Sequence, residues 1–365
     1  MPVEFISAIN ANRASDVDPG AGNGFDHEFA HEYAKVLDEG GFDYTLVPYS
    51  SSWIDANQFA QFVVNHTERL KPMLAHRPGV IFPTHAARAF ATLDQIGRGR
   101  LAIHIIAGGQ DAEQRREGDY LSKAERYARA DEYIQILRRV WTETEPFDHD
   151  GAYYKFEGFR SEIRPYQDAI PVSVGGSSEE AYRVGGRQGD IFGLWGEPLA
   201  ETKQQIDSVN AQADAAGRPH PRIWVSFRPI VAATDDLAWE RAHELLGRIE
   251  TGYADRAAKR HYPIAGTTVP QNVGSQRLLA LAERGELHDR ALWTAPAKAT
   301  NAAGSSTALV GSPETVAAAL LDYVDIGCEL LSIRGFDPFD DAIGYAKHVL
   351  PLVRQELEHR KPATV

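Results

Sequence analysis

Short apolar runs alternate with amphipathic helical patterns along most of this chain, and this alternation constrains the fold more than any other sequence feature. Residues 101–107, for example, are apolar almost throughout, as a parallel strand buried on both faces requires. The helix expected from about residue 125 places Ala130, Ile134, Leu137 and Trp141 on one stripe. Eight such strand and helix repeats predict an α/β protein with the (β/α)8 TIM barrel fold. The expected strands lie near residues 3–9, 42–48, 71–76, 101–107, 170–174, 190–194, 223–231 and 330–334.

Two segments interrupt the rhythm. In the first, about 143–165, an Asp-Gly pair between β-like flanks predicts a hairpin over 147–154. The second, 251–306, has no clear alternation and ends in a run of small residues that is typical of a mobile loop. We therefore expect one barrel domain over residues 1–365 with two insertions, the second of which includes a lid. A doubly wound open sheet is the alternative, but no Gly-x-Gly-x-x-Gly follows the first strand.

Composition limits the partners and the location of the protein. With 38 Lys and Arg against 51 Asp and Glu, the net charge of −13 argues against nucleic acid as the main partner. The single cysteine, Cys328, permits neither an intramolecular disulfide nor a cysteine-based metal site. No long apolar segment predicts a membrane span, and the first residues do not resemble a leader. We expect a cytoplasmic protein with no bound metal and no membrane partner.

Polar and aromatic residues gather at the carboxyl ends of the expected strands, where barrel enzymes place their active sites. Side chains alternate between the two faces of a strand, so His104 shares a face with Gly108, while His76 and Arg77 point to opposite faces. His104 is either a core histidine with one polar partner or a ligand to a flat molecule. Trp195 either stacks on a ring or simply packs. The candidates, in chain order, are Asn10, Tyr49, His76, His104, Ala107, Gly175, Trp195, Arg228, Arg334 and Phe336.

The turn Gly175-Gly176-Ser177-Ser178 leads from the fifth strand into a helix. Its glycines allow close approach of a ligand, and the helix N-terminus and two hydroxyls together favour a phosphate. The alternative is an ordinary serine N-cap, and Glu179 and Glu180 in the first turn agree with that.

Arg228 and Arg334 are charged residues in apolar strands, and each predicts either a structural ion pair or an anionic ligand. Glu197 is one carboxylate that could pair with Arg228. The sequence contains no nucleophile elbow and no metal-ligand motif. An enzyme without either usually depends on an organic cofactor.

Several stretches occur in one order over nearly the whole chain: Leu70–Val80, Pro83–Asp94 with Gly99-Arg100, Gly118–Leu121 with Glu125–Glu132, Phe147–Gly151, Gly175–Ser178, Trp195–Pro198 and Thr307–Gly311. Together they resemble the bacterial luciferase-like flavin-dependent monooxygenases, in particular the two-component FMNH2-dependent alkanesulfonate monooxygenases. The resemblance implies a barrel with lid-forming insertions, FMN as cofactor in its reduced form, O2 as co-substrate, and a separate NAD(P)H-dependent flavin reductase. It also implies a homodimer or homotetramer.

By position, the resemblance implies that Tyr127 and the Gly176-Ser177-Ser178 turn hold the FMN phosphate. His104 and Trp195 then border the flavin ring, with Ala107 and Gly175 nearby, and the loop 296–306 acts as the lid. We expect His104, Arg228 and Trp195 as catalytic residues. The substrate-binding candidates are Asn10, Tyr49, His76, Arg228 and Phe336.

This chain departs from the sulfonate enzymes where they bind their substrate. Ser226 and Arg228 stand where those enzymes have an arginine and a histidine, and Phe336 replaces a tyrosine. Ala302-Ala303-Gly304 replaces the lid arginine, and Ser52-Trp53 replaces a cysteine. Several groups that bind the sulfonate or act as acid and base are therefore not carried over. Two other functions stay open: a deazaflavin (F420)-dependent oxidoreductase of the same fold and a non-catalytic flavin-binding protein.

Overall fold

All eight expected strands form in the computed structural model, which describes residues 3–15, 24–259, 269–302 and 307–360. With the helices that separate them, they make the predicted (β/α)8 TIM barrel, and this fold class is confirmed. In chain order the strands are β1 (Glu4–Ala8), β2 (Tyr44–Val47), β3 (Lys71–His76), β4 (Ala102–Ile105), β7 (Val172–Gly175), β8 (Ile191–Trp195), β9 (Arg222–Val231) and β13 (Cys328–Ile333).

The helices mostly begin and end where the sequence signals them. Asp26, Asp55, Ser122, Ser178 and Ser312 each cap a helix with a side-chain oxygen. The helices are α1 (His27–Glu39), α2 (Ala56–His66), α3 (Pro83–Ile96), α4 (Asp111–Arg115), α5 (Lys123–Thr142), α6 (Glu179–Gln188), α7 (Leu199–Ala215), α8 (Asp235–Lys259), α9 (Val273–Arg284), α10 (Ala295–Ala299), α11 (Pro313–Asp325), α12 (Pro338–His348) and α13 (Leu350–His359).

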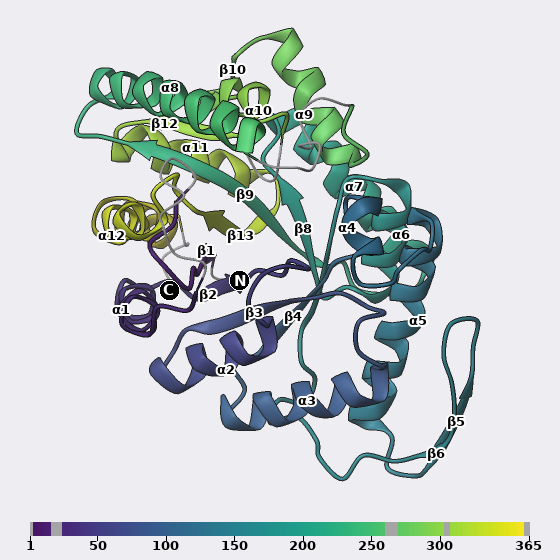
Figure 1. Cartoon of the computed structure of the whole chain (residues 1–365). Coiled ribbons are helices and arrows are strands. Elements are labelled where there is room, and N and C mark those ends of the chain that lie inside the picture. The colour runs from purple at the N-terminus through teal and green to yellow at the C-terminus, as the bar shows by residue number, and fades with distance from the viewer. Residues whose placement is uncertain (1–2, 16–23, 260–268, 303–306, 361–365) are drawn as a thin grey trace. The chain divides into compact units, whose positions relative to one another are not determined.

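The chain divides into two compact units. The central unit comprises residues 44–193 and 207–222, and the terminal unit comprises residues 1–43, 194–206 and 223–365. In the central unit, β2, β3, β4, β7 and β8 are parallel neighbours in that order. Helices α2, α3, α5 and α6 belong to this unit. The predicted hairpin forms as β5 (Phe147–Asp150) and β6 (Lys155–Phe159) and lies beside α5 in Figure 1.

Side-chain contacts show which face of the central strands carries the site. His76 on β3 packs against Phe90 of α3, and Phe192 on β8 lies against Gly185 of α6, so both side chains point toward the helices. His104 and Ser173 are register partners and alternate with these residues, so they point to the opposite, inner face.

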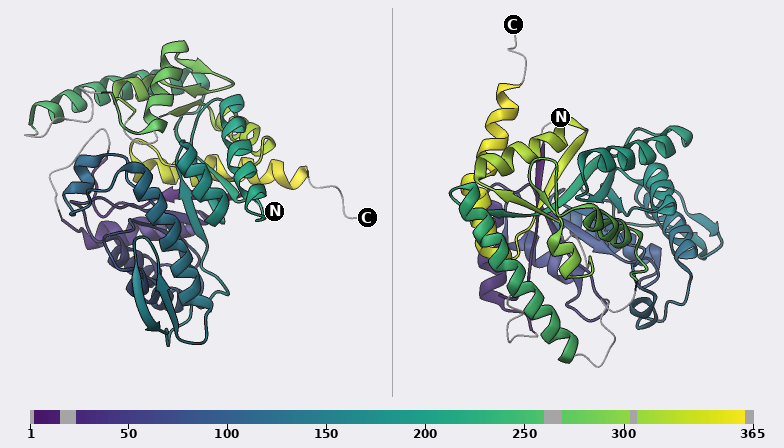
Figure 2. Two further views of the ribbon diagram at one scale, coloured as in Figure 1. Left: turned by 90° about the vertical axis from the view of Figure 1, so that its right-hand side faces the viewer. Right: turned by 90° about the horizontal axis from the view of Figure 1, so that it is seen from above.

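In the terminal unit, β1, β13, β9 and β12 (Ala308–Gly311) are parallel neighbours. The first part of β9 pairs with β13 and its last part with β12, which accounts for its length. The short strands β10 (Leu287–His288) and β11 (Leu292–Trp293) continue this sheet beyond β12 in antiparallel pairing. Figure 2 shows these elements together with α8, α9 and α10 from two further directions.

The second insertion is more regular than the sequence indicated. Helix α8 continues to Lys259, and α9, β10, β11 and α10 lie in the segment expected to lack alternation. The expected lid loop at 296–306 starts as part of α10, and Ala302 is fully buried, while 303–306 lie outside the described residues. The expected last helix is two helices, because the chain turns at Val349 before Pro351.

Two further searches cover only the described residues. No helix among them has both the length and the apolar composition needed to cross a membrane. Within the same ranges, no group of three or more His, Cys, Asp or Glu side chains is arranged to hold a metal ion.

Candidate active site

The turn between β7 and α6 forms a cradle that only glycine allows. Gly176 adopts φ +138°, and a Cβ on it would lie 2.8 Å from Tyr127 Oη and 2.9 Å from Ala181 Cβ. Ser178 is the N-cap of α6 and accepts a hydrogen bond from Ala181 N at 3.4 Å. The capping interpretation is therefore correct for Ser178, whereas Ser177 is half-buried and takes no part in the cap. The start of α6 and the Ser177 hydroxyl offer donors to an anion, beside the Glu180 carboxylate that is hydrogen-bonded to Ser178.

Tyr127 reaches this turn from α5, whose start is fixed by a capping box between Ser122 and Glu125. Its side chain is 8% exposed and its hydroxyl is hydrogen-bonded to Ser178. Burial raises the pKa of Tyr127 to about 12, although the bond to Ser178 acts in the opposite direction. The phenol is therefore neutral at physiological pH and can donate its proton to a phosphate oxygen.

His104 lies on the inner face of β4, next to the same turn. Its Nδ1 is 2.9 Å from Ser173 Oγ, and its Cε1 would be 3.0 Å from a Cβ placed on Gly175. Burial lowers the pKa of His104 to about 4, so the ring is neutral at physiological pH. A neutral imidazole held by a serine can exchange a hydrogen bond with a ligand without bringing a charge into the site.

His76, one of the expected substrate residues, faces the helices instead of the inner face. Its Nε2 is 2.7 Å from Tyr133 Oη of α5, and burial lowers its pKa to about 3. Its neighbour Arg77 is thus the member of the pair on the inner face. The sequence left both options open. Strand alternation requires His76 and Arg77 to point to opposite faces of the strand, but it does not say which of them points inward.

Arg77 organises a polar cluster at the carboxyl ends of β2 and β3. Its guanidinium, only 3% exposed, pairs with Glu117 at 2.5 Å and Glu113 at 2.9 Å and lies 4.7 Å from the ring centre of Tyr49. The Tyr49 hydroxyl donates to Glu117 at 2.5 Å. Burial and that hydrogen bond both raise the pKa of Tyr49, so it stays neutral. Sequence reasoning missed the two glutamates because Glu113 lies in α4, a five-residue helix too short for a periodic pattern, and Glu117 lies in the loop that follows.

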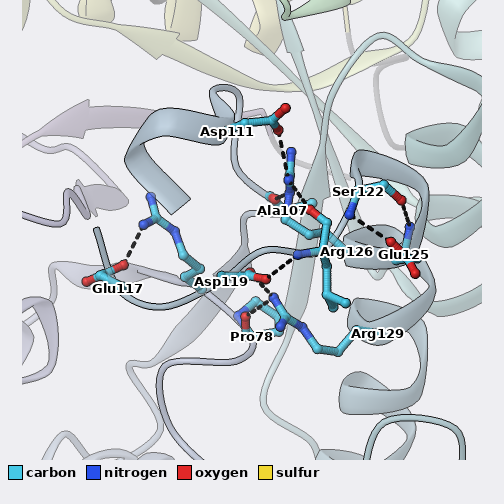
Figure 3. Close-up of polar contacts among 11 residues, drawn as sticks. Pro78, Ala107, Asp111, Glu117, Asp119, Ser122, Glu125, Arg126 and Arg129 are labelled. Atoms are coloured by element: carbon cyan, nitrogen blue, oxygen red, sulfur yellow. Dashed lines mark hydrogen bonds and ion pairs between the residues drawn. The ribbon is translucent and has the colours of Figure 1, made fainter. Parts of the chain in front are cut away.

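Two more arginines hold the connection between β4 and α5. Arg126, 3% exposed, donates from Nε to the Ala107 carbonyl at 2.9 Å and from Nη1 to Asp111 at 3.0 Å. Arg129 pairs with Asp119 at 2.5 Å and donates to the Pro78 carbonyl (Figure 3). Ala107, an expected cofactor contact, therefore has its carbonyl engaged by Arg126. The connection is fixed by side-chain contacts rather than by sheet pairing.

Beneath this connection lies a buried amide without a partner. Gln114 is fully buried, and neither Oε1 nor Nε2 has a hydrogen-bond partner in the described part of the chain. A Cβ on Gly108 would lie 2.1 Å from Gln114 Nε2, so the amide packs directly on the Gly108 backbone. Gly108 lies in the connection after β4, which ends at Ile105, and adopts φ +84°. An amide in this position has donor and acceptor capacity that the protein itself does not use.

In the terminal unit, Trp195 ends β8 and is half-buried. It packs against a small apolar cluster of the second insertion, which contains Leu278, Leu281, Ala297 and Ala302. Asn10, beyond β1, uses its amide to donate to the Ala14 carbonyl at 3.1 Å and so shapes its own loop.

Arg228 and Arg334 lie on one face of the neighbouring strands β9 and β13. Ser226 and Ser332 are register partners with hydroxyls 3.4 Å apart, and each arginine follows its serine by two residues. Arg228 is 8% exposed and lies 5.1 Å from the ring centre of Phe336, a cation–π contact. Phe336 itself is buried in an apolar cluster. Glu197, which the sequence offered as a partner for Arg228, is instead bound by Arg277.

The sequence and the fold are similar to those of known proteins. Residues 4–330 match the family model described as luciferase-like monooxygenase. The fold is similar to riboflavin lyase RcaE with modified FMN and riboflavin, at TM-score 0.77 and 18% identity over 98% of this chain and 92% of that chain. It is also similar to EDTA monooxygenase EmoA from Chelativorans sp. BNC1, at 0.75 and 17% identity over 100% and 96% of the two chains.

A third similar structure is an F420-dependent secondary alcohol dehydrogenase, at TM-score 0.70 and 14% identity over 97% of this chain and 100% of that chain. The family model spans most of this sequence. The EDTA monooxygenase and the F420-dependent alcohol dehydrogenase both have a fold similar to that of this chain. The sequence-based expectation of a flavin-dependent enzyme is thereby confirmed at the level of the family. This chain belongs to the luciferase-like monooxygenase family and is an oxidoreductase.

Proposed function

We propose that the protein is a monooxygenase that uses FMNH2 and O2 to oxidise a small organic substrate. The observation that carries this proposal is the cradle at Gly176, which has the Tyr127 phenol and the start of α6 beside it. The cradle suits a phosphate because hydroxyl and N–H donors surround it, although the Glu180 carboxylate lies beside it and is hydrogen-bonded to Ser178. A separate NAD(P)H-dependent flavin reductase supplies the reduced cofactor.

The bound flavin supplies the electrons that activate O2, and the residues of this chain bind, orient and shield it. Tyr127 and Ser177 hold the phosphate, and Ser178 caps α6 beside them. His104 borders the ring as a neutral hydrogen-bonding group, positioned by Ser173. Trp195 is a further residue proposed to contact the flavin, and it packs against the apolar cluster of the second insertion.

The substrate carries an anionic head group, such as a sulfonate or carboxylate, that Arg228 binds. Arg228 is buried, always charged, and placed over the Phe336 ring, with Arg334 on the same face. Since Phe336 cannot donate the hydrogen bond of the tyrosine found in sulfonate enzymes, we expect a substrate that differs from a short alkanesulfonate.

The class is tested by rapid mixing of the FMNH2-loaded protein with O2. We expect a transient near-ultraviolet absorbance that free flavin lacks, and one oxygen atom from labelled O2 in the product. Reoxidation at the rate of free flavin contradicts the monooxygenase and leaves a flavin-binding protein.

The deazaflavin alternative is favoured by one observation, the similar fold of the F420-dependent alcohol dehydrogenase. Equilibrium titration with FMN and with F420, each oxidised and reduced, separates the two cofactors. Tighter binding of F420 together with hydride transfer to a carbonyl compound would replace the first proposal.

The substrate head group is tested by a substrate screen coupled to a flavin reductase, run on the wild type and on Arg228→Met. We expect anionic substrates to lose at least 100-fold in kcat/KM, because a charge-assisted pair in a buried site is worth about 3 kcal/mol or more. Turnover of uncharged compounds only, unaffected by the substitution, shows that Arg228 is structural.

A further inference from the structure

The end of β8 is held from two sides. On the barrel side, the Gly196 carbonyl accepts from Thr307 Oγ1 at 2.9 Å, and the Glu197 carbonyl accepts from Tyr323 Oη at 2.7 Å. Gly196 N donates to the Ser226 carbonyl at 2.9 Å, and a Cβ on Gly196 would lie 2.2 Å from Phe227 Cε1. The backbone at 196–197 is therefore fixed to its neighbours in the terminal unit and has no room to shift.

On the other side, the Glu197 side chain holds the second insertion. The carboxylate is 1% exposed, and both of its oxygens accept from the Arg277 guanidinium of α9, at 2.7 Å from Nε and 2.5 Å from Nη2. A buried carboxylate that loses such a partner is strongly destabilising, because its charge is then left in an apolar site. Arg277 is 33% exposed, so only the carboxylate depends on the pair.

Strand β8 and helix α9 also meet at Trp195, which lies two residues before Glu197 in the chain. A Cβ on Gly274 of α9 would lie 2.9 Å from Trp195 Cε3 and 3.1 Å from Cζ3. The start of α9 therefore contacts the six-membered ring of the indole, and Leu278 and Leu281 of that helix and Ala302 belong to the apolar cluster against which Trp195 packs. Ser275 Oγ donates to the Ala302 carbonyl at 2.8 Å and ties the two ends of the described insertion together.

We propose that Glu197 and Arg277 form a latch that docks α9 on the end of β8 and thereby positions Trp195 for flavin binding. Arg277 is a positioning residue that acts through Glu197 and Trp195. The apolar contacts of α9 with Trp195 orient the indole, and the buried ion pair keeps α9 in the one register in which Gly274 meets the ring. The docking is a property of the protein alone; its effect on the flavin rests on the proposed function.

The chain contains a matched control on the same helix. Arg284 of α9 pairs with Glu201 of α7, but the arginine side chain is 58% exposed and the glutamate 21% exposed. An exposed pair of this kind is worth about 1 kcal/mol or less. Arg277→Met and Arg284→Met thus remove the same charge from α9, in one case from beside a buried carboxylate and in the other from beside a partly exposed one.

The latch is tested on the cofactor-free protein by hydrogen exchange over 273–302 and by tryptophan emission, with Trp195→Phe identifying the signal of that residue. We expect Arg277→Met to speed exchange at least tenfold and to shift the Trp195 emission to the red, and Arg284→Met to change exchange less than twofold. In the double variant Glu197→Gln/Arg277→Met, no buried charge is left at this position. Most of the protection against hydrogen exchange should therefore return. Equal behaviour of the two arginine variants, or no recovery in the double variant, overturns the latch.

The effect on the site is measured as FMN affinity by quenching of flavin fluorescence. Arg277→Met should raise the Kd at least fivefold and Arg284→Met should leave it unchanged. If the wild type does not bind FMN, the proposed function fails, while the exchange and emission results still decide the latch. If the wild type binds FMN and Arg277→Met loosens α9 without changing the Kd, the positioning role of the latch is wrong.

Discussion

At the scale of single residues, we expect Ser177 to contribute to FMN binding and Ser178 to contribute to the stability of the fold. Ser178 caps α6, so Ser178→Ala should cost about 0.5–2 kcal/mol in the free energy of unfolding. Ser177→Ala removes no cap and should leave stability unchanged, but it should lower FMN affinity about tenfold, because a hydrogen bond to a charged group is worth about 1.5–3 kcal/mol. Titration with FMN and with riboflavin measures this. Equal losses for both ligands would show that the turn does not bind phosphate.

The buried amide of Gln114 predicts an unusual gain in stability. Because neither amide atom has a partner, replacing Gln114 by the similarly shaped methionine should raise the free energy of unfolding by about 1–3 kcal/mol. Urea denaturation measures the change, with Gln58→Met at an exposed position of α2 as the control, expected within about 0.5 kcal/mol. A destabilised Gln114→Met protein would mean that the amide does contribute to folding.

The two buried histidines predict a loss of stability in acid. Burial lowers the pKa of His76 to about 3 and of His104 to about 4, both below the ordinary value of 6.5. Between pH 7 and pH 5 the unfolded chain therefore binds protons at these histidines that the folded protein does not bind. Each histidine should lower the free energy of unfolding at pH 5 by about 2 kcal/mol relative to pH 7. Unfolding free energies at both pH values test this. His76→Gln or His104→Gln should each remove about half of that loss, and an unchanged pH dependence would contradict the assignment.

At the scale of elements, the β5–β6 hairpin depends on one side chain of α5. Glu132 accepts from the backbone N–H groups of Tyr153 and Tyr154 and lies 3.0 Å from His149 Nε2. Glu132→Ala should therefore release the hairpin and speed its amide exchange at least tenfold, while α5 itself stays protected. Gln135→Ala, one turn further along α5, is the control. Unchanged exchange in Glu132→Ala would mean that the aromatic packing of the hairpin is sufficient.

The elements that the sequence predicted are those with a local signal. The eight barrel strands are apolar runs, Asp-Gly marks the hairpin, and serine or aspartate caps mark several helix starts. In contrast, α4 and α10 are five residues long, too short for a periodic pattern. The sequence also did not predict the parallel pairing of β12 with β9, because partner choice depends on residues far apart in the chain. For the same reason the Arg77 cluster and the Glu197–Arg277 pair appear only in the folded protein.

At the scale of the whole molecule, the fold class followed from counting repeats, but the assembly did not. We propose a homodimer or homotetramer, since barrel enzymes of this family associate through their outer helices. Sedimentation velocity at micromolar concentration should therefore give a species of at least twice the chain mass of 40.3 kDa. A single species at the mass of one chain over the whole concentration range would contradict this.

The pairing of β1 with β13 has a consequence for how the protein is made. Glu4 lies beside Leu330, so β1 must wait until β13 has been synthesised before this pairing can form. Residues 44–193 of the central unit, in contrast, are one continuous stretch, and the strands that pair within it are all synthesised before β13. While the residues between β1 and β13 are being synthesised, β1 therefore presents an edge without its partner. Protection of that edge by a chaperone matters more for this protein than for one whose neighbouring strands are made in succession.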